Sequence, residues 1–193
     1  MKKIALVLFG LVIMFGCKDT NKARNPIKQT TDEVTQKTMK DKLNEYVAVK
    51  LTTDVSLLSE KEKQMIPLLI QATNIMNDLF WYQTYGDKVA LLSKISDEDT
   101  KTFVGINYGP WDRMNGNVSF VDGIGAKPAG ANFYPADMTK DEFEAAELDG
   151  KNSLYTFLRR DAEGKLTTIP FNEQFKAPLS EVASFLLEAA KLS

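Results

Sequence analysis

The chain has 193 residues, of which 44% are hydrophobic, enough to build one folded core. The formal net charge is −2 and no basic patch or zinc-finger spacing is present, so nucleic acid is not an expected partner. The sequence has no histidine, which excludes a Ser-His-Asp triad and a HExxH zinc helix. Carboxylate pairs, lysine or tyrosine bases and carboxylate-only metal sites remain open.

The first 16 residues are typical of a signal peptide. Lys2 and Lys3 precede an apolar run at residues 4–15, which is too short to cross a bilayer. Gly16 then precedes the single cysteine, Cys17, in the order found at a lipoprotein processing site. We therefore expect cleavage and lipidation at Cys17, which anchors the chain in the cell envelope, facing the periplasm or the cell surface. A plain cleaved signal or an uncleaved anchor is the alternative.

Residues 17–45 are expected to form a flexible tether behind the lipid. Residues 18–42 are rich in lysine, threonine and aspartate and contain few apolar residues, so they cannot bury enough surface to fold alone. The folded region is expected to begin at residue 46. Residues 46–51 alternate in a way typical of a short edge strand.

A long helix is predicted after Ser59, which has capping-box spacing with Glu62. Apolar residues recur at helical spacing up to Phe80, and Pro67 inside this pattern predicts either a kink or an early position in the helix. The aromatic residues at 80–82, together with Tyr85, are interpreted as part of the core, with a ligand shelf as the alternative.

Two shorter helices are predicted next, one over residues 87–95 and one that is capped by Ser96 or Asp97 and runs toward Asn107. Residues 106–139 then hold five of the eleven glycines and three of the seven prolines, which excludes regular helix or sheet. Their many aromatic residues predict a long ordered loop. Within it, Asn115-Gly116 predicts a turn, followed by a short strand at residues 118–121.

The last third of the chain is predicted to hold a helix, a hairpin and a final helix. Thr139 and Glu142 have capping-box spacing and start a helix that runs to about residue 148. Alternating runs at residues 153–160 and 165–171 predict a β-hairpin. After Pro178, an amphipathic helix has one expected apolar stripe, made of Leu179, Val182, Ala183, Leu186, Leu187 and Ala190.

These elements predict a mainly helical α+β fold, a helical bundle with a small β-hairpin and a long ordered loop rich in glycine, proline and aromatic residues. The candidate binding residues lie in that loop: Asn107, Trp111, Asp112 and Arg113. An arginine beside an aspartate on a rigid aromatic turn is suited to binding a peptide terminus, because guanidinium binds carboxylate in a bidentate way. The alternative is an ion pair that holds the loop together, with Trp111 buried.

Residues 106–113, INYGPWDR, resemble the amino-terminal region of bacterial proteins in the dipeptidyl peptidase III-like zinc hydrolase family. Residues 125–128 (GAKP), 130–139 (GANFYPADMT) and 153–156 (SLYT) strengthen the resemblance, which covers roughly residues 46–192. It implies a two-lobed, largely helical metallopeptidase, in which peptide lies in a cleft between the lobes and the carboxyl-terminal lobe holds zinc.

The family's histidine-bearing zinc helix, its second glutamate ligand and its tyrosine-containing substrate segment have no matching positions in this chain. We therefore assign no catalytic or metal-binding residue and expect no cofactor in this chain, although the full-length family holds zinc. The family's histidine ligands have no counterpart in a sequence without histidine.

The leading hypothesis is a membrane-anchored lipoprotein whose residues 46–193 are a truncated amino-terminal lobe of such a peptidase, inactive alone. Its expected partners are the lipid membrane, through Cys17, and a peptide or the missing carboxyl-terminal lobe. The alternative is a non-catalytic envelope module that binds a peptide or a partner protein. A third hypothesis is a small enzyme that uses Asp112, Arg113 or Tyr134.

Overall fold

The computed structural model describes residues 37–193. The expected signal peptide, the expected lipidation site Cys17 and the first part of the expected tether lie outside the described residues. Within residues 37–193, none of the helices combines the length and the apolar character that a membrane span requires.

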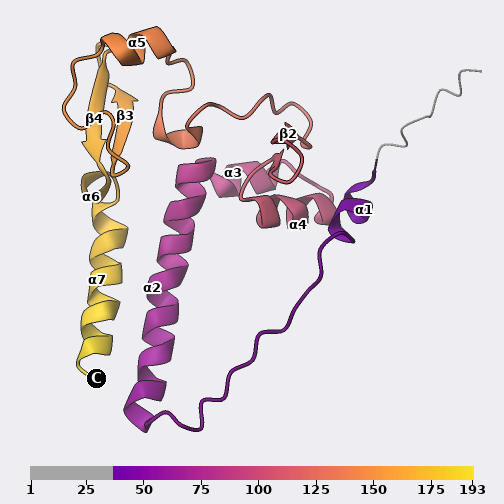
Figure 1. The fold of residues 1–193 in the computed structure, drawn as a ribbon, viewed down its shortest axis with the longest axis vertical. Coiled ribbons are helices and arrows are strands. Elements are labelled where there is room, and N and C mark those ends of the chain that lie inside the picture. The colour runs from indigo at the N-terminus through magenta and orange to yellow at the C-terminus, as the bar shows by residue number, and fades with distance from the viewer. Residues whose placement is uncertain (1–36) are drawn as a thin grey trace, which may run out of the picture. The chain divides into compact units, whose positions relative to one another are not determined.

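The described region is mostly helical, with two small antiparallel sheets, which confirms the predicted α+β class (Figure 1). Its helical elements are α1 (Met39–Leu43), α2 (Glu60–Thr84), α3 (Lys88–Ser93), α4 (Glu98–Asn107), the 3-10 turn η1 (Ala131–Phe133), α5 (Lys140–Ala145), α6 (Phe171–Gln174) and α7 (Lys176–Ala190). Its strands are β1 (Trp111–Asp112), β2 (Val118–Ser119), β3 (Thr156–Arg160) and β4 (Leu166–Pro170). β1 pairs with β2, and β3 pairs with β4.

Helix α1 lies inside the segment that was expected to be tether. A capping box between Thr38 and Asp41 starts it, and it packs against α4. Just after the helix, Tyr46 meets the ring of Phe103 edge to face. The structure therefore differs from the expected tether at this end, because α1 has a core to pack against.

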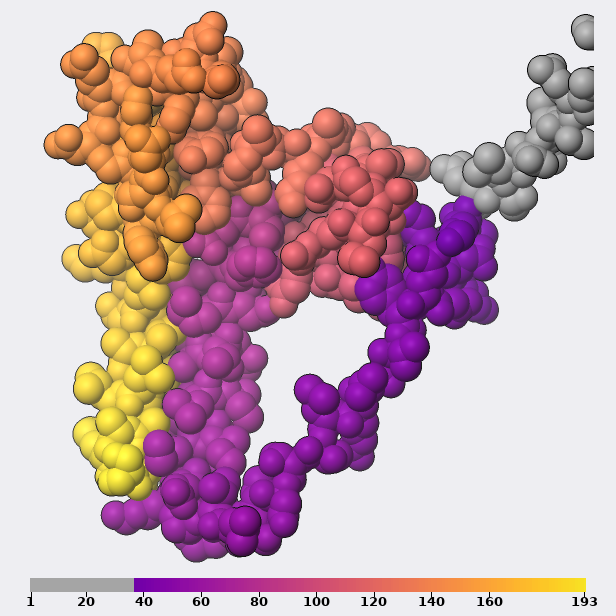
Figure 2. Space-filling model, viewed as in Figure 1, coloured from indigo at the N-terminus to yellow at the C-terminus, as the bar shows by residue number. Residues whose placement is uncertain are grey.

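The predicted edge strand at residues 46–51 is wrong. Residues 47–57 are exposed and form no strand, and Figure 2 shows them as a single thread of chain. An alternating sequence forms a strand only when a neighbouring strand supplies hydrogen-bond partners.

Helix α2 begins with the predicted capping box. The Ser59 hydroxyl accepts from the Glu62 amide at 3.2 Å, and the Glu62 carboxylate accepts from the Ser59 amide at 2.7 Å. The helix continues past Pro67, which lies in its interior and not in its first turn.

The end of α2 lies between two hydrophobic clusters. Leu79 and Trp81 are two residues apart, about 200° around the helix, so they face opposite sides. Trp81 packs with buried residues of α3 and α4 and their connection, whereas Leu79 packs with Phe157 of β3 and with Phe175. The interpretation of this aromatic segment as core is therefore confirmed for Trp81.

Helix α3 begins where predicted and ends two residues earlier than predicted, at Ser93, and α4 is capped by Asp97, one of its two predicted caps. The Asp87 carboxylate accepts from the Ala90 amide, and that of Asp97 accepts from the Thr100 amide. α4 ends at Tyr108, whose left-handed backbone (φ 53°) turns the chain sharply into the 106–139 loop.

The first strand pair brackets the predicted Asn115-Gly116 turn. β2 lies within the predicted strand at residues 118–121, with Trp111 opposite Ser119 and Asp112 opposite Val118. β1 was not predicted, because two residues beside Gly109 and Pro110 are too short a run to show a period of two.

The predicted β-hairpin is confirmed by β3 and β4, which pair from Thr156–Pro170 at the open end to Arg160–Leu166 at the turn. Helix α5 also starts at Thr139 as predicted, and the Thr139 hydroxyl accepts from the Glu142 amide at 3.1 Å. It ends at Ala145, earlier than predicted.

Helices α2 and α7 lie side by side and run in opposite directions (Figure 1). The buried positions of α7 are Val182 and Ala189, while Leu186 and Leu187 of the expected stripe are exposed by 48% and 66%. The apolar residues of α7 therefore extend around the helix beyond the face that α2 covers.

Candidate functional site

Asn107, the first candidate binding residue, is buried at the end of α4. Its side-chain amide donates to the carbonyl of Phe103 at 2.9 Å, and its side-chain oxygen accepts from the amide of Arg113 at 3.0 Å. These bonds use the side chain to tie the helix end to the β1–β2 turn. Asn107 therefore has a structural role in this region.

Trp111 is buried, as the alternative interpretation of the loop expected. Its indole N–H donates to the carbonyl of Gly125 at 2.9 Å, and its ring lies 5.7 Å from that of Tyr85. The Lys127 ammonium lies 6.0 Å from the same ring, within cation–π range. Trp111 thus joins the end of α2 to a segment of the loop 14–16 residues further along the chain.

Asp112 is also buried, and its ion-pair partner is Lys42 of α1, not the neighbouring Arg113. The Lys42 ammonium donates to the carboxylate at 2.7 Å. The other carboxylate oxygen accepts from the Met114 amide at 3.2 Å. Arg113 itself is exposed, so it alone of the four candidate residues presents its side chain freely to solvent.

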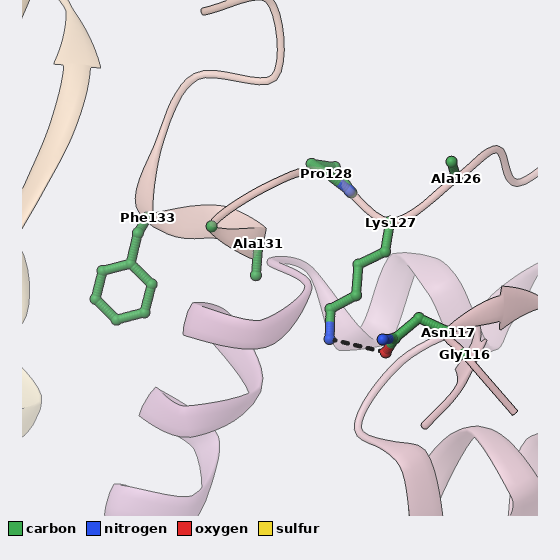
Figure 3. Close-up of a pocket in the computed structure, with 8 residues that line it drawn as sticks. Gly116, Asn117, Ala126, Lys127, Pro128, Ala131 and Phe133 are labelled. Carbon is green, nitrogen blue, oxygen red and sulfur yellow. Dashed lines mark hydrogen bonds between the residues drawn. The ribbon is translucent and has the colours of Figure 1, made fainter. Parts of the chain in front are cut away.

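Two hollows lie along the 106–139 loop and share Pro128 and Ala131. The larger has a volume of about 690 Å³ (Figure 3). Lys127 reaches into it from one side, and its ammonium donates to the side-chain oxygen of Asn117 at 3.4 Å (Figure 3). The lining residues are Gly116, Asn117, Ala126, Lys127, Pro128, Gly130, Ala131 and Phe133.

The smaller hollow, which we call the Arg159 pocket, has a volume of about 340 Å³. The end of α2, the η1 turn, the segment after it and β3 enclose it. Of the four candidate residues, Trp111 lines it. The full lining is Thr84, Tyr85, Trp111, Pro128, Ala131, Asn132, Tyr134, Pro135, Ala136, Asp137, Arg159 and Arg160.

Gly130 shapes the wall of this pocket. Its φ of +75° is in the left-handed region, and a Cβ at this position would lie 2.2 Å from an atom of the Tyr134 ring. Glycine is therefore required for Tyr134 to fold back over the chain, where it meets Phe143 edge to face at 5.7 Å.

Arg159 and Arg160 have different electrostatic surroundings. Arg160 donates to the carboxylates of Asp137 and Glu142 at 2.8 Å each. The hydrogen bond to Glu142 holds the pKa of that carboxyl below its ordinary range, and the two bonds together raise the pKa of Arg160. Arg159 donates to backbone carbonyls instead, those of Asn132, Phe133 and Leu158. The positive charge of Arg160 is compensated, and that of Arg159 is not matched by a carboxylate within residues 37–193.

Sequence reasoning did not single out Arg159 or Arg160 as pocket residues, and it named Tyr85 only under the alternative interpretation, as part of a ligand shelf. Their positions along the chain gave no indication, because the pocket joins α2 to a strand more than 70 residues later. The one usable signal was the adjacent arginine pair at the end of a predicted strand. It gives no information about which segment the strand faces.

Zinc, which the family resemblance implies, does not fit the described residues. Within residues 37–193 there is no group of three or more His, Cys, Asp or Glu side chains placed to hold a metal ion. Zinc sites in peptidases are built from histidine and carboxylate ligands, and this sequence has no histidine. We therefore assign no chemical step through zinc to this part of the chain.

Comparisons with solved structures find dipeptidyl peptidase III. The structure from Caldithrix abyssi matches 80% of this chain with 34% identity and a TM-score of 0.73. That from Corallococcus sp. strain EGB matches 80% with 29% identity and a TM-score of 0.72. In both cases the chain covers 31% of the solved structure.

Among curated proteins, Nudix hydrolase 3 from Arabidopsis thaliana is 23% identical over 226 residues, a match to 85% of this chain and 29% of the relative. No family model matches the chain. The chain thus spans less than a third of the length of each of these three proteins. It is a partial dipeptidyl peptidase III-like region.

Proposed function

We propose that this chain supplies the amino-terminal lobe of a dipeptidyl peptidase III-like zinc peptidase, and that its 106–139 loop forms one wall of the peptide-binding cleft. The observation that carries the proposal is the match to two dipeptidyl peptidase III structures, at 34% and 29% identity over 80% of the chain. Under this proposal the zinc ligands belong to a part of the peptidase outside residues 37–193.

Two features of the described region support a role as one side of a cleft. The loop carries two adjoining hollows, and aromatic side chains together with two arginines line the smaller of them. In addition, Leu186 and Leu187 leave an apolar surface on α7 that α2 does not cover. Such a surface suits contact with the rest of a larger peptidase.

We further propose that the chain is a lipoprotein of the cell envelope. The sequence order of Lys2, Lys3, an apolar run and Cys17 supports this proposal. Metabolic labelling with an azido-palmitate tests it. The wild-type chain is expected to incorporate the label and the Cys17→Ser chain to lose it. Equal labelling of the two chains would refute lipidation at this residue.

The lobe proposal is tested with a chimera. Residues 37–193 replace the matching region of the Caldithrix abyssi protein, and zinc-dependent release of dipeptides from a dipeptidyl arylamide is measured. A folded chimera is expected to retain turnover, and Trp111→Ala in the chimera is expected to raise KM because Trp111 lines the Arg159 pocket. A folded chimera without turnover would contradict the proposal. Zinc-dependent turnover by the 193-residue chain alone would contradict the placement of zinc elsewhere.

A second candidate function is a non-catalytic envelope module that binds a peptide or a partner protein. The observation that favours it is the pair of hollows, which are complete within the described residues. Peptide binding by the isolated chain, together with an inactive chimera, would support this function over the lobe proposal.

A further inference from the structure

The Arg159 pocket contains an arginine, Arg159, that contacts no carboxylate within residues 37–193. The Arg159 guanidinium donates to the carbonyl oxygens of Phe133 (3.1 Å), Leu158 (2.7 Å) and Asn132 (3.0 Å). Its central carbon, Cζ, also lies 4.8 Å from the ring centroid of Phe157. These contacts fix the position of the guanidinium, but a carbonyl oxygen carries only a partial charge, so the full positive charge remains.

The same contacts leave part of the guanidinium free for a ligand. Arginine has five N–H donors, and three are used in the bonds to Asn132, Phe133 and Leu158. The other arginine of the pocket, Arg160, is already held by Asp137 and Glu142. Among the residues that line the pocket, Arg159 is therefore the cation that is open to an anionic group.

The rest of the lining suits the remainder of a peptide. Tyr85, Trp111 and Tyr134 provide aromatic surface to the pocket. A volume of about 340 Å³ falls at the lower end of the range for small-ligand sites, about 300–1,000 Å³. It accommodates a terminal residue or two, not a long segment.

We propose that the Arg159 pocket binds a carboxylate of a peptide, with the carboxylate on the Arg159 guanidinium and an apolar or aromatic side chain against Tyr85 and Tyr134. The inference rests on the proposed function for one point, that the ligand is a peptide. The carboxylate has two sources, the peptide's carboxyl terminus and an acidic side chain, and both offer the same chemistry to arginine.

The test measures binding to the full chain by isothermal titration calorimetry with three N-acetylated tetrapeptides. The first ends in phenylalanine with a free carboxylate, the second is its carboxyl-terminal amide, and the third is an amide with an internal glutamate. We expect the amide to bind at least about ten-fold more weakly than the acid, because a charge-assisted hydrogen bond is lost. Recovery of affinity by the third peptide assigns the site to acidic side chains, and no recovery assigns it to the carboxyl terminus.

Replacing Arg159 itself would also break its three carbonyl bonds, so a different variant keeps the test decisive. Ala136→Glu adds a carboxylate at an exposed position of the pocket lining and leaves Arg159 in place. It is expected to compete with the peptide and lower affinity at least about ten-fold. Ala129→Glu is the matched control, because it adds the same charge to the same loop at a residue outside both linings.

Equal binding of acid and amide would overturn the inference, as would equal affinity of the Ala136→Glu and Ala129→Glu chains or the absence of measurable binding. The outcome is separable from that of the lobe proposal. If binding depends on the carboxylate but the chimera is inactive, the proposed carboxylate site is supported and the lobe proposal is refuted. If the chimera is active but the acid and the amide bind equally, the lobe proposal is supported and the carboxylate site is refuted.

Discussion

The ammonium of Lys42 lies 2.7 Å from the carboxylate of Asp112, and this ion pair joins α1 to β1 across 70 residues of sequence. The two side chains are exposed by only 19% and 8%, so water screens the pair weakly. It is the contact through which the segment before α2 reaches the 106–139 loop. Trp111, which lines the Arg159 pocket, is the neighbour of Asp112 in the chain, so the pair holds the strand that carries this part of the pocket wall.

Removing one partner of this pair is expected to destabilise the fold. Lys42→Met leaves a buried carboxylate without its cation, and we expect a loss of about 2 kcal/mol in the free energy of unfolding, measured in urea. The double variant Lys42→Met/Asp112→Asn should lose less unfolding free energy than the sum of the losses in the two single variants, because its buried uncompensated charge is removed.

Lys37→Met is the control for this prediction. Lys37 pairs with Glu45, and both side chains are largely exposed, so its replacement is expected to leave the urea midpoint unchanged. A Lys42→Met chain as stable as the Lys37→Met chain would show that the Lys42–Asp112 pair contributes no stability.

The Arg160–Glu142 pair predicts a specific loss of stability in acid. Hydrogen bonds from Arg160 hold the pKa of Glu142 below its ordinary value of 4.5, so the folded state binds this proton more weakly than the unfolded state. The stabilisation is fully present above that value and is lost as the pH falls through the lowered pKa. Melting temperatures of wild type and Glu142→Gln should therefore differ at neutral pH and converge in acid.

Glu144→Gln provides the comparison, because Glu144 lies in the same helix and its pairing with Lys140, at 3.5 Å, is exposed. Its melting temperature is expected to follow that of the wild type across the whole pH range. If Glu142→Gln behaves in the same way, the ion pair with Arg160 does not contribute to stability.

Gly130→Ala is expected to destabilise the fold and deform the Arg159 pocket. The new methyl would meet the Tyr134 ring at 2.2 Å in a backbone with φ +75°. We expect a loss of about 2–4 kcal/mol, from left-handed strain and displacement of the ring. Gly123→Ala measures the backbone strain alone, because Gly123 has φ +76° and a methyl added there would have no atom within 4 Å. We expect this change to lower the free energy of unfolding by about 1 kcal/mol. If the two variants lose the same unfolding free energy in urea, the Tyr134 ring moves aside for the new methyl without cost.

Phe157→Ala is expected to cost about 3–5 kcal/mol in the free energy of unfolding. Phe157 is fully buried, and its ring meets those of Tyr82, Phe133, Phe171 and Phe175. Tyr155→Ala, two residues away and 76% exposed, should change the unfolding free energy by less than about 0.5 kcal/mol. A small effect at both positions would contradict the central place of Phe157 in its cluster.

Local signals in the sequence determined most of the secondary structure. The predicted capping residues Ser59, Asp97 and Thr139 each accept from the amide three residues further on, so local spacing alone marks these helix starts. The alternating runs around residues 161–164 likewise predicted the hairpin, because turn and strand pattern are neighbours along the chain. Motifs in the 106–139 loop also carried the family resemblance, which the structural matches bear out.

Tertiary contacts decided where those elements meet and which charges pair. Residues 46–51 have a strand pattern but no neighbouring strand, and Glu142 has capping-box spacing but gives its carboxylate to Arg160. Asp112 likewise pairs with Lys42 and not with the adjacent Arg113.

The Arg159 pocket also depends on tertiary contacts, because its walls come from α2, the 106–139 loop and β3, which are far apart in the sequence. The spacing of residues in the sequence predicts only contacts between residues that are near each other along the chain. An ion pair or a pocket wall depends on distances in space, which arise once burial of the Leu79 and Trp81 clusters has drawn distant segments together.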